Sequence, residues 1–213
     1  MWLFLLKRRM HMPLQPKKGW LEVIVGPMFA GKTEELLRRI RRLEYAKQKV
    51  VVFKPSIDDR YEENAIISHN RTSADSISIN AAEEIFNHVD KDTDVVAIDE
   101  VQFLDDAVLD VVDHLIQKGK MVMTSGLDLD FRGEPFSFVP ILMARAEYVM
   151  KLSAVCVRCG APATRTQRII DGKPAKYYDP VVMIGASESY EARCRHCHKV
   201  YRKPTPYKTM KDL

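Results

Sequence analysis

The segment Gly26–Thr33 reads GPMFAGKT, which fits the phosphate-loop pattern G-x-x-x-x-G-K-[ST]. The apolar run Leu21–Val25 precedes it and a helical pattern follows, which is the context that such a loop requires. Backbone amides at a helix N-terminus attract phosphate, Lys32 can reach the β- and γ-phosphates, and the Thr33 hydroxyl can ligate Mg²⁺. The alternative is a chance match in a glycine-containing turn. We predict that nucleotide is bound by Gly26, Pro27, Met28, Phe29, Ala30, Gly31, Lys32 and Thr33.

A second apolar run, Val95–Ile98, leads directly into the acidic pair Asp99 and Glu100. A buried strand that ends in an acid places that acid beside a phosphate loop, where Asp99 can hold Mg²⁺ directly or through water. Glu100 then faces the cleft and can accept a proton from an attacking hydroxyl or water. Taken alone, the pair could be a surface turn. Together with the upstream loop it predicts Asp99 as the metal-side acid and Glu100 as the catalytic base.

All four cysteines form two C-x-x-C pairs, namely Cys156 with Cys159 and Cys194 with Cys197. Two such knuckles can supply four thiolates to a structural Zn²⁺ ion, leaving no open position for catalysis. Free thiols, disulfides or a redox pair are the alternatives. His196 and His198 flank Cys197, and either could replace a thiolate; we favour Cys197 because it completes the second pair.

Length and composition set the frame for these motifs. The chain has 213 residues, 46% of them hydrophobic and 29% charged, which excludes a wholly disordered or collagen-like protein. The formal net charge of +4 suits an anionic small substrate as well as a nucleic acid. The basic run 38–42 has acidic partners one helical turn earlier, so we interpret it as a solvated or subunit face.

Short apolar runs alternate with helical stretches along the first two thirds of the chain. Strands buried on both faces are expected at Leu21–Val25, Val50–Phe53, Val95–Ile98, Met121–Thr124 and Tyr148–Leu152. Helices are expected at Thr33–Lys47, with Glu34/Arg38 and Glu35/Arg39 pairs, and at Ala81–Val89 and Asp105–Lys118. This alternation predicts an α/β protein with a parallel sheet.

The expected organisation is an N-terminal extension (1–18), an α/β nucleotide-binding domain (19–150), a small zinc-binding domain (151–204) and a tail (205–213). The apolar run 1–6 is too short to span a bilayer and precedes its basic cluster, the reverse of a signal peptide. Met10 and Met12 are candidate starts, and we expect the extension to be dispensable. These features predict a cytoplasmic protein with reduced cysteines and no membrane partner.

The chain closely resembles the zinc-containing type II thymidine kinase family over about residues 19–204. The resemblance is in the order and spacing of the phosphate loop, the cysteine pairs and four further motifs: Lys54–Tyr61 (KPSIDDRY), Asp99–Phe103 (DEVQF), Gly126–Phe136 (GLDLDFRGEPF) and Val182–Tyr190 (VMIGASESY). It implies a P-loop NTPase (RecA-like) core with a zinc-stapled lasso loop that closes over a nucleoside.

The resemblance also implies roles for particular residues. Glu100 would be the base that acts on the 5′-hydroxyl of thymidine, with ATP and Mg²⁺ as cofactors. On the nucleotide side, it adds Asp58, Arg60 and Gln102 to the phosphate loop and Asp99. The nucleoside would stack on Phe131, with further contacts from Met28, Leu127, Thr166, Val181, Val182, Met183, Ile184, Gly185 and Tyr190.

The resemblance implies, finally, a homotetramer that takes thymidine and deoxyuridine, forms dTMP and is inhibited by dTTP. Two other classes remain open from the residues alone. One is a nucleic-acid-binding NTPase with a zinc ribbon, which the basic balance favours but for which no aromatic-and-basic strand is evident. The other is a zinc-ribbon interaction module in which nucleotide binding is only regulatory.

Overall fold

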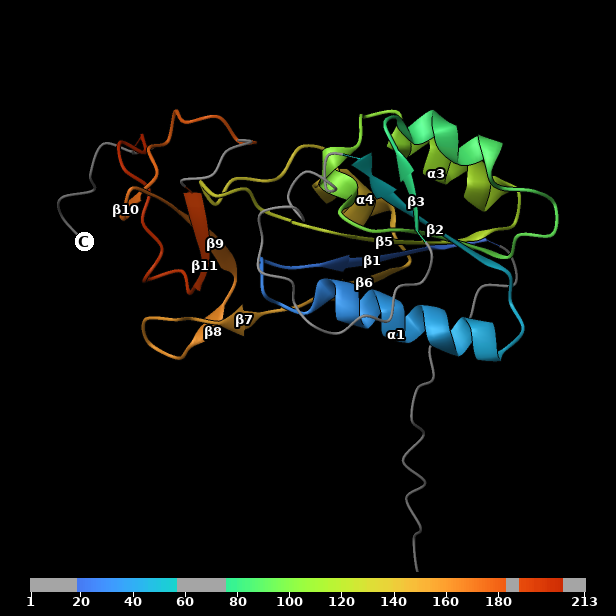
Figure 1. The fold of residues 1–213 in the computed structure, drawn as a ribbon, viewed down its shortest axis with the longest axis horizontal. Helices are drawn as coiled ribbons and strands as arrows, with labels where there is room; N and C mark the ends of the chain where they lie inside the picture. The colour runs from blue at the N-terminus through green and yellow to red at the C-terminus, as the bar shows by residue number, and fades with distance from the viewer. Residues whose placement is uncertain (1–18, 57–75, 183–187, 205–213) are drawn as a thin grey trace, which may run out of the picture.

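Figure 1 shows the fold in a computed structural model of the chain, in which residues 19–56, 76–182 and 188–204 are described. A sheet lies between two helical layers, and a smaller lobe of short strands lies beside one end of the sheet. The segments 1–18 and 205–213 lie outside the described residues. The same holds for five predicted site residues: Asp58, Arg60, Met183, Ile184 and Gly185.

The central sheet has six parallel strands in the order β3-β2-β4-β5-β1-β6. Their bounds are β1 Leu21–Val25, β2 Val50–Pro55, β3 Ser76–Ile79, β4 Val95–Ile98, β5 Met121–Gly126 and β6 Tyr148–Lys151. The five strands expected from apolar runs are present, but the expected burial on both faces is wrong for β6, which is mostly exposed because it lies at the edge of the sheet. Strand β3 was not predicted, because a strand at the sheet edge is partly exposed and its sequence, SISI, lacks the continuous apolar character of a buried strand.

Helices cover both faces of the sheet (Figure 1). Helix α1 (Lys32–Tyr45) packs on one face, while the 3₁₀-helix η2 (Ala82–Asn87), α3 (Val108–Gln117) and α4 (Val139–Arg145) pack on the other. The short 3₁₀-helix η3 (Val101–Phe103) follows β4. The segment expected to be helical at 81–89 forms a 3₁₀-helix. Its backbone amides donate to carbonyls three residues earlier in the chain, as the His88 amide does to the Ile85 carbonyl.

The smaller lobe begins directly after β6. It holds a two-stranded sheet of β7 (Ala154–Val155) and β8 (Pro162–Ala163), and a three-stranded antiparallel sheet of β9 (Arg165–Ile170), β10 (Lys173–Pro174) and β11 (Glu188–Arg193). The lobe contains both cysteine pairs. None of the helices in the described parts of the chain is long and apolar enough to cross a membrane.

Helix α1 is fastened to the sheet by a charged cluster at its N-terminal half. Glu35 accepts hydrogen bonds from Arg38 at 2.6 Å and from Arg39 at 2.8 Å, and Arg39 also pairs with Glu22 of β1. The expected Glu35/Arg39 pair is thus present. Arg38, however, pairs with Glu35 rather than with the exposed Glu34, because Glu35 lies on the side of the helix that faces the sheet edge.

This cluster predicts a pH-dependent contribution to stability. The hydrogen bond from Arg38, together with the hydrogen bond and charge of Arg39, outweighs the partial burial that raises the pKa of Glu35, and the pKa is lowered to about 2. Because the folded pKa lies below the unfolded value, the stabilisation is present above about pH 4.5 and is lost as the pH falls toward 2. Glu35→Gln should therefore lower the free energy of unfolding by about 1 kcal/mol at neutral pH, a size typical of partly exposed pairs.

Urea unfolding of the wild type and Glu35→Gln, compared between about pH 7 and about pH 3, measures this difference. Glu34→Gln is the matched control, since it removes a charge from the next residue of the same helix without breaking a described ion pair. The gap between wild type and Glu35→Gln should shrink at the acid end. A gap that stayed constant with pH would rule out the carboxylate charge as its source.

Candidate active site

The loop between β1 and α1 packs tightly against the chain that follows β6. A Cβ atom at Gly26 would lie 2.7 Å from the carbonyl oxygen of Leu152, so only glycine fits there. Gly31 has a left-handed φ of 78° and directly precedes α1. The buried Lys32 side chain curls back over the loop, its Nζ lying 3.3 Å from the carbonyl oxygen of Pro27. The loop therefore ends at a helix N-terminus, the arrangement that favours phosphate.

The carboxylate of Asp99 joins three parts of the site. It accepts hydrogen bonds from the Thr33 hydroxyl at 2.9 Å, the Ser125 hydroxyl at 2.6 Å and the Glu100 amide at 3.0 Å. Thr33 belongs to the phosphate loop, and Ser125 to β5, the strand that lies between β1 and β4. The predicted acidic pair after β4 and the predicted phosphate loop after β1 thus meet at the carboxyl end of the sheet, on either side of β5. Ser125 was not predicted, because no local motif marks it.

Gln102 holds the side chain of Glu100 in place. Its side-chain amide donates to the Glu100 carboxylate at 2.5 Å, and its carbonyl oxygen accepts from the Leu127 amide at 3.0 Å. Gln102 is buried, and Glu100 has a left-handed backbone with φ 46° and ψ 42°. A Cβ atom at Gly126 would lie 2.5 Å from the Gln102 oxygen, so this glycine makes room for the network. Gln102 is therefore placed to orient Glu100.

The residues predicted to contact a nucleoside come from both the core and the smaller lobe. Leu127, Phe131 and Thr166 are buried, while Tyr190 is half-buried on β11. The Thr166 hydroxyl accepts a hydrogen bond from the Met28 amide at 3.0 Å, which ties β9 to the phosphate loop. The described part of the segment after β10 ends with Val181 and Val182, the latter 38% exposed. Of these predicted residues, Thr166 directly contacts the phosphate loop. Two loop residues not yet placed are Phe29, which is exposed, and Ala30, which packs against the cysteine lobe.

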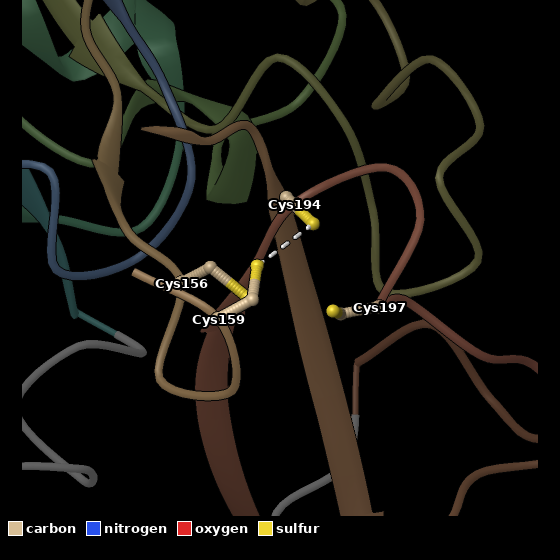
Figure 2. A group of neighbouring side chains, drawn as sticks. All are labelled: Cys156, Cys159, Cys194 and Cys197. Atoms are coloured by element: carbon tan, nitrogen blue, oxygen red, sulfur yellow. Dashed lines mark hydrogen bonds between the residues drawn. The ribbon is translucent and has the colours of Figure 1, made fainter. Parts of the chain in front are cut away.

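The four cysteines converge at one point, as Figure 2 shows. Their sulfur atoms all lie within 4.8 Å of one another, and the Sγ atoms of Cys159 and Cys194 are 3.6 Å apart. Cys156 and Cys194 are buried, Cys197 is half-buried and Cys159 is exposed. Four sulfurs in this arrangement form the donor set that Zn²⁺ prefers in closed structural sites. The predicted clustering of the two pairs is confirmed.

The thiols of this cluster do not titrate alike. Burial raises the pKa of Cys156, but backbone hydrogen bonds, that from Cys194 foremost, outweigh it and bring the pKa to about 6. Hydrogen bonding to the neighbouring Cys194 and Cys159 sulfurs raises the pKa of Cys197 to about 12. Sulfurs this close cannot all carry negative charge without a cation among them. Their chemistry therefore fits a divalent metal ion, which would hold all four as thiolates.

The two histidines beside Cys197 have different surroundings. His196 is exposed. The Nε2 atom of His198 lies 2.9 Å from the carbonyl oxygen of Phe131, a hydrogen bond that requires the proton on Nε2. A second hydrogen bond joins the same two segments: the Nζ atom of Lys203 donates to the Arg132 carbonyl at 2.8 Å. The second knuckle is thus attached to the loop that carries Phe131, a link that nothing local in the sequence indicates.

These features define a class of protein. The parallel sheet, the phosphate loop and the adjacent Asp99 are those of a P-loop nucleotide-binding α/β protein, here with a four-cysteine lobe. The family model for thymidine kinase matches residues 19–198, and the chain therefore belongs to the thymidine kinase family. Membership implies a nucleoside kinase, a transferase that uses ATP.

Two solved structures are similar to part of the chain. Domain III of the Thermotoga maritima replication initiation protein DnaA shares 18% identity, with 63% of this chain and 55% of that chain covered and a TM-score of 0.39. A DNA replication initiation factor shares 14% identity, with coverages of 62% and 40% and a TM-score of 0.37. The matches thus span about half the length of those proteins, and neither likeness bears on function.

The cysteine cluster predicts one structural zinc ion per chain. Cys197→Ser should lose metal and loosen the segment 156–204, because one of four thiolates is removed from a closed site. His196→Ala is the matched control, being one residue away and exposed, and it should keep the metal. Elemental analysis and thermal melting of both variants measure this. A wild-type protein with well under one zinc per chain, or loss of metal in His196→Ala, would contradict the four-cysteine site.

Proposed function

We propose that this protein transfers the γ-phosphoryl group of ATP to the 5′-hydroxyl of thymidine, giving dTMP and ADP. The observation that supports this most strongly is the placement of Glu100. It lies directly after Asp99, which bonds the phosphate loop, and Gln102 orients it toward the segment that carries Leu127. A phosphate site and a potential base are therefore adjacent. Membership of the thymidine kinase family is the basis for proposing a nucleoside as the second substrate.

The phosphate loop and Asp99 form the nucleotide half of the proposed site. The amides of residues 26–33 would surround the phosphates, and Lys32 would uncurl from Pro27 to reach the γ-phosphate. Mg²⁺ would be held by the Thr33 hydroxyl and the Asp99 carboxylate, and when bound it supplies charge neutralisation at the β- and γ-phosphates. Both oxygens already lie together at 2.9 Å, which suits a shared cation. Asp58 and Arg60 are proposed on this side from the family resemblance.

The nucleoside half would consist of residues from the core and the lobe. Phe131 would stack on the thymine ring, and Met28, Leu127 and Thr166 would surround its methyl group. The buried apolar side chains of Phe131 and Leu127 suit an uncharged pyrimidine. Backbone groups of residues 181–185 and the side chain of Tyr190 would hydrogen-bond the base and sugar. Deoxyuridine, which lacks only the methyl group, would be a second substrate, because one methyl contributes little discrimination.

The proposed chemical step forms one P–O bond, breaks another and moves one proton. The 5′-oxygen of the nucleoside forms a bond to the γ-phosphorus, and the bond from that phosphorus to the β,γ-bridging oxygen breaks, releasing ADP. The 5′-hydroxyl proton passes to the Glu100 carboxylate. Asp99 is occupied by three hydrogen bonds, which leaves Glu100 as the acid of the pair that faces the nucleoside. Closure of the lobe over the site would exclude water and so prevent ATP hydrolysis.

Further properties are proposed on the family resemblance: a cytoplasmic homotetramer inhibited by dTTP, with no nucleic-acid partner. The edge strand β6 supports an assembly, since Val149 and Met150 are 44% and 37% exposed at the edge of the sheet formed by the described residues. Inhibition by dTTP is chemically reasonable, because one molecule presents both the base and a triphosphate. Sedimentation with and without nucleotide tests the tetramer.

A nucleoside panel tests the proposed function. The protein is incubated with MgATP and each of the common deoxynucleosides, and monophosphate formation is measured. Thymidine and deoxyuridine should be phosphorylated, and purine deoxynucleosides should not. ATP hydrolysis stimulated by single-stranded DNA, without any nucleoside monophosphate, would overturn the proposal in favour of a nucleic-acid-dependent NTPase.

The assignment of the base predicts a particular kinetic signature. Glu100→Gln keeps the shape of the side chain and can still accept the hydrogen bond from Gln102, but it cannot take up a proton. The value of kcat should fall on the order of 10²–10⁴-fold, as for a lost general base. The thymidine KM should change much less, and MgATP should still bind.

Lys32→Ala is the contrasting variant, and it should weaken nucleotide binding as well as turnover, because it removes a cation from the phosphates. Direct titration with ATP separates the two variants. If Glu100→Gln kept a near-normal kcat while Asp99→Asn was inactive, Glu100 would not be the base, and positioning with the metal would account for the catalysis.

A further inference from the structure

Arg168 is a fully enclosed cation at the centre of the smaller lobe. It lies in β9 and is 2% exposed, the largest of the fully buried side chains. Its Nε donates to the Tyr190 hydroxyl at 3.1 Å, one terminal nitrogen donates to the Pro180 carbonyl at 2.5 Å, and the other donates to the Val181 carbonyl. The guanidinium also stacks over the ring of Phe131, 4.2 Å from its centroid. No sequence motif had marked this residue.

The pleat of β9 accounts for this position. Side chains two residues apart on a strand point to the same face, so Arg168 shares its face with Thr166, which bonds the phosphate loop. Tyr190 of β11 is directly opposite Arg168 in the antiparallel register. Cross-strand pairs of this kind place two side chains in contact. The lobe therefore directs Thr166, Arg168 and Tyr190 together toward the core.

The cost of burying a charge explains why the contacts of Arg168 are linked. A buried cation destabilises the protein unless its donors are satisfied and its charge is compensated. Here two consecutive carbonyl oxygens, a phenol oxygen and the faces of two aromatic rings contribute to that compensation. The guanidinium is planar and its donors have fixed directions, so these groups must keep their mutual geometry. Movement of any one of them would leave a buried donor unpaired.

We propose that Arg168 is the positioning residue of the nucleoside subsite. It fixes the Phe131 ring, the Tyr190 hydroxyl and the Pro180–Val181 backbone in one geometry before a nucleoside binds. The inference rests on the proposed function, in which these three groups contact the base. It also sets a direction for stacking: the guanidinium occupies one face of Phe131, so the base stacks on the opposite face.

Arg193 provides a matched control. It is also a buried arginine of the same three-stranded sheet, at 8% exposure, and its partner is the neighbouring Glu191 rather than any proposed nucleoside residue. A general loss of lobe stability should follow from Arg193→Met as well as from Arg168→Met. Loss of order at the nucleoside subsite should follow only from Arg168→Met. Zinc content is measured for both variants, because Arg193 adjoins Cys194.

The first experiment measures hydrogen exchange in the zinc-loaded protein without any nucleoside. Arg168→Met should exchange faster than wild type around residues 129–133 and 176–182, whereas Arg193→Met should keep wild-type protection there. Arg168→Lys should be intermediate, since a lysine can donate to one carbonyl but cannot span the fork. Unchanged protection of both segments in Arg168→Met would overturn the positioning role, whatever the substrate of the enzyme.

The second experiment separates nucleoside binding from turnover. In Arg168→Met the thymidine KM should rise roughly 10-fold or more, as for a lost set of hydrogen bonds to a charged group, with the MgATP KM little changed. Arg193→Met should keep both values near wild type. A wild-type enzyme that does not phosphorylate thymidine would defeat the proposed function alone. A wild-type enzyme that does so, with an unchanged thymidine KM in Arg168→Met, would defeat the role of Arg168 alone.

Discussion

Three hydrogen bonds to the Asp99 carboxylate hold together the parts of the site that different strands supply. They come from the phosphate loop, from β5 and from the backbone of Glu100. In a parallel sheet the carboxyl ends of the strands lie at one edge, so the carboxylate that follows β4 can reach both the adjacent strand β5 and the phosphate loop that follows β1. The position of Glu100 relative to the loop follows from this contact. The left-handed backbone of Glu100 then turns the chain into η3, which brings Gln102 back onto the Glu100 carboxylate.

The smaller lobe would supply the second half of the proposed site. Its four-cysteine cluster lies in a part of the chain that has little apolar core of its own. The buried apolar cluster of the lobe consists of three alanines and two of the metal-binding cysteines themselves. So small a core stabilises little by burial, and a tetrathiolate metal centre supplies the cross-link that such lobes need. His198, which follows the last cysteine, connects this cluster to the proposed nucleoside subsite by a hydrogen bond to the carbonyl of Phe131. The cysteine cluster and the proposed nucleoside subsite are therefore linked through this contact.

Polar contacts join the smaller lobe to the core in the described parts of the chain. Thr166 bonds the Met28 amide, and Arg168 stacks on Phe131 while bonding the segment that ends at Val181. Polar contacts of this kind are directional, and they lose their value when the geometry changes. They therefore specify one arrangement of lobe and core. Such an arrangement suits a site in which reacting groups from both halves must meet within a fraction of an ångström.

The sequence by itself determined the sheet, the phosphate loop, the acidic pair and the four-cysteine cluster. Each is encoded locally, by a run of apolar residues or by fixed spacings within a few positions. Such local patterns can be recognised in the sequence before the fold is known. Edge strand β3 and the 3₁₀ form of η2 escaped prediction because their local patterns are weak. Only the tertiary structure decided which distant groups meet: the Met28 amide with the Thr166 hydroxyl, 138 residues apart, or the Phe131 carbonyl with the His198 ring, 67 residues apart. The tertiary structure also brought Gln102 into contact with Glu100 and buried Arg168. Those contacts depend on strand register and on how the lobe packs against the core. No single segment of the sequence specifies either of these.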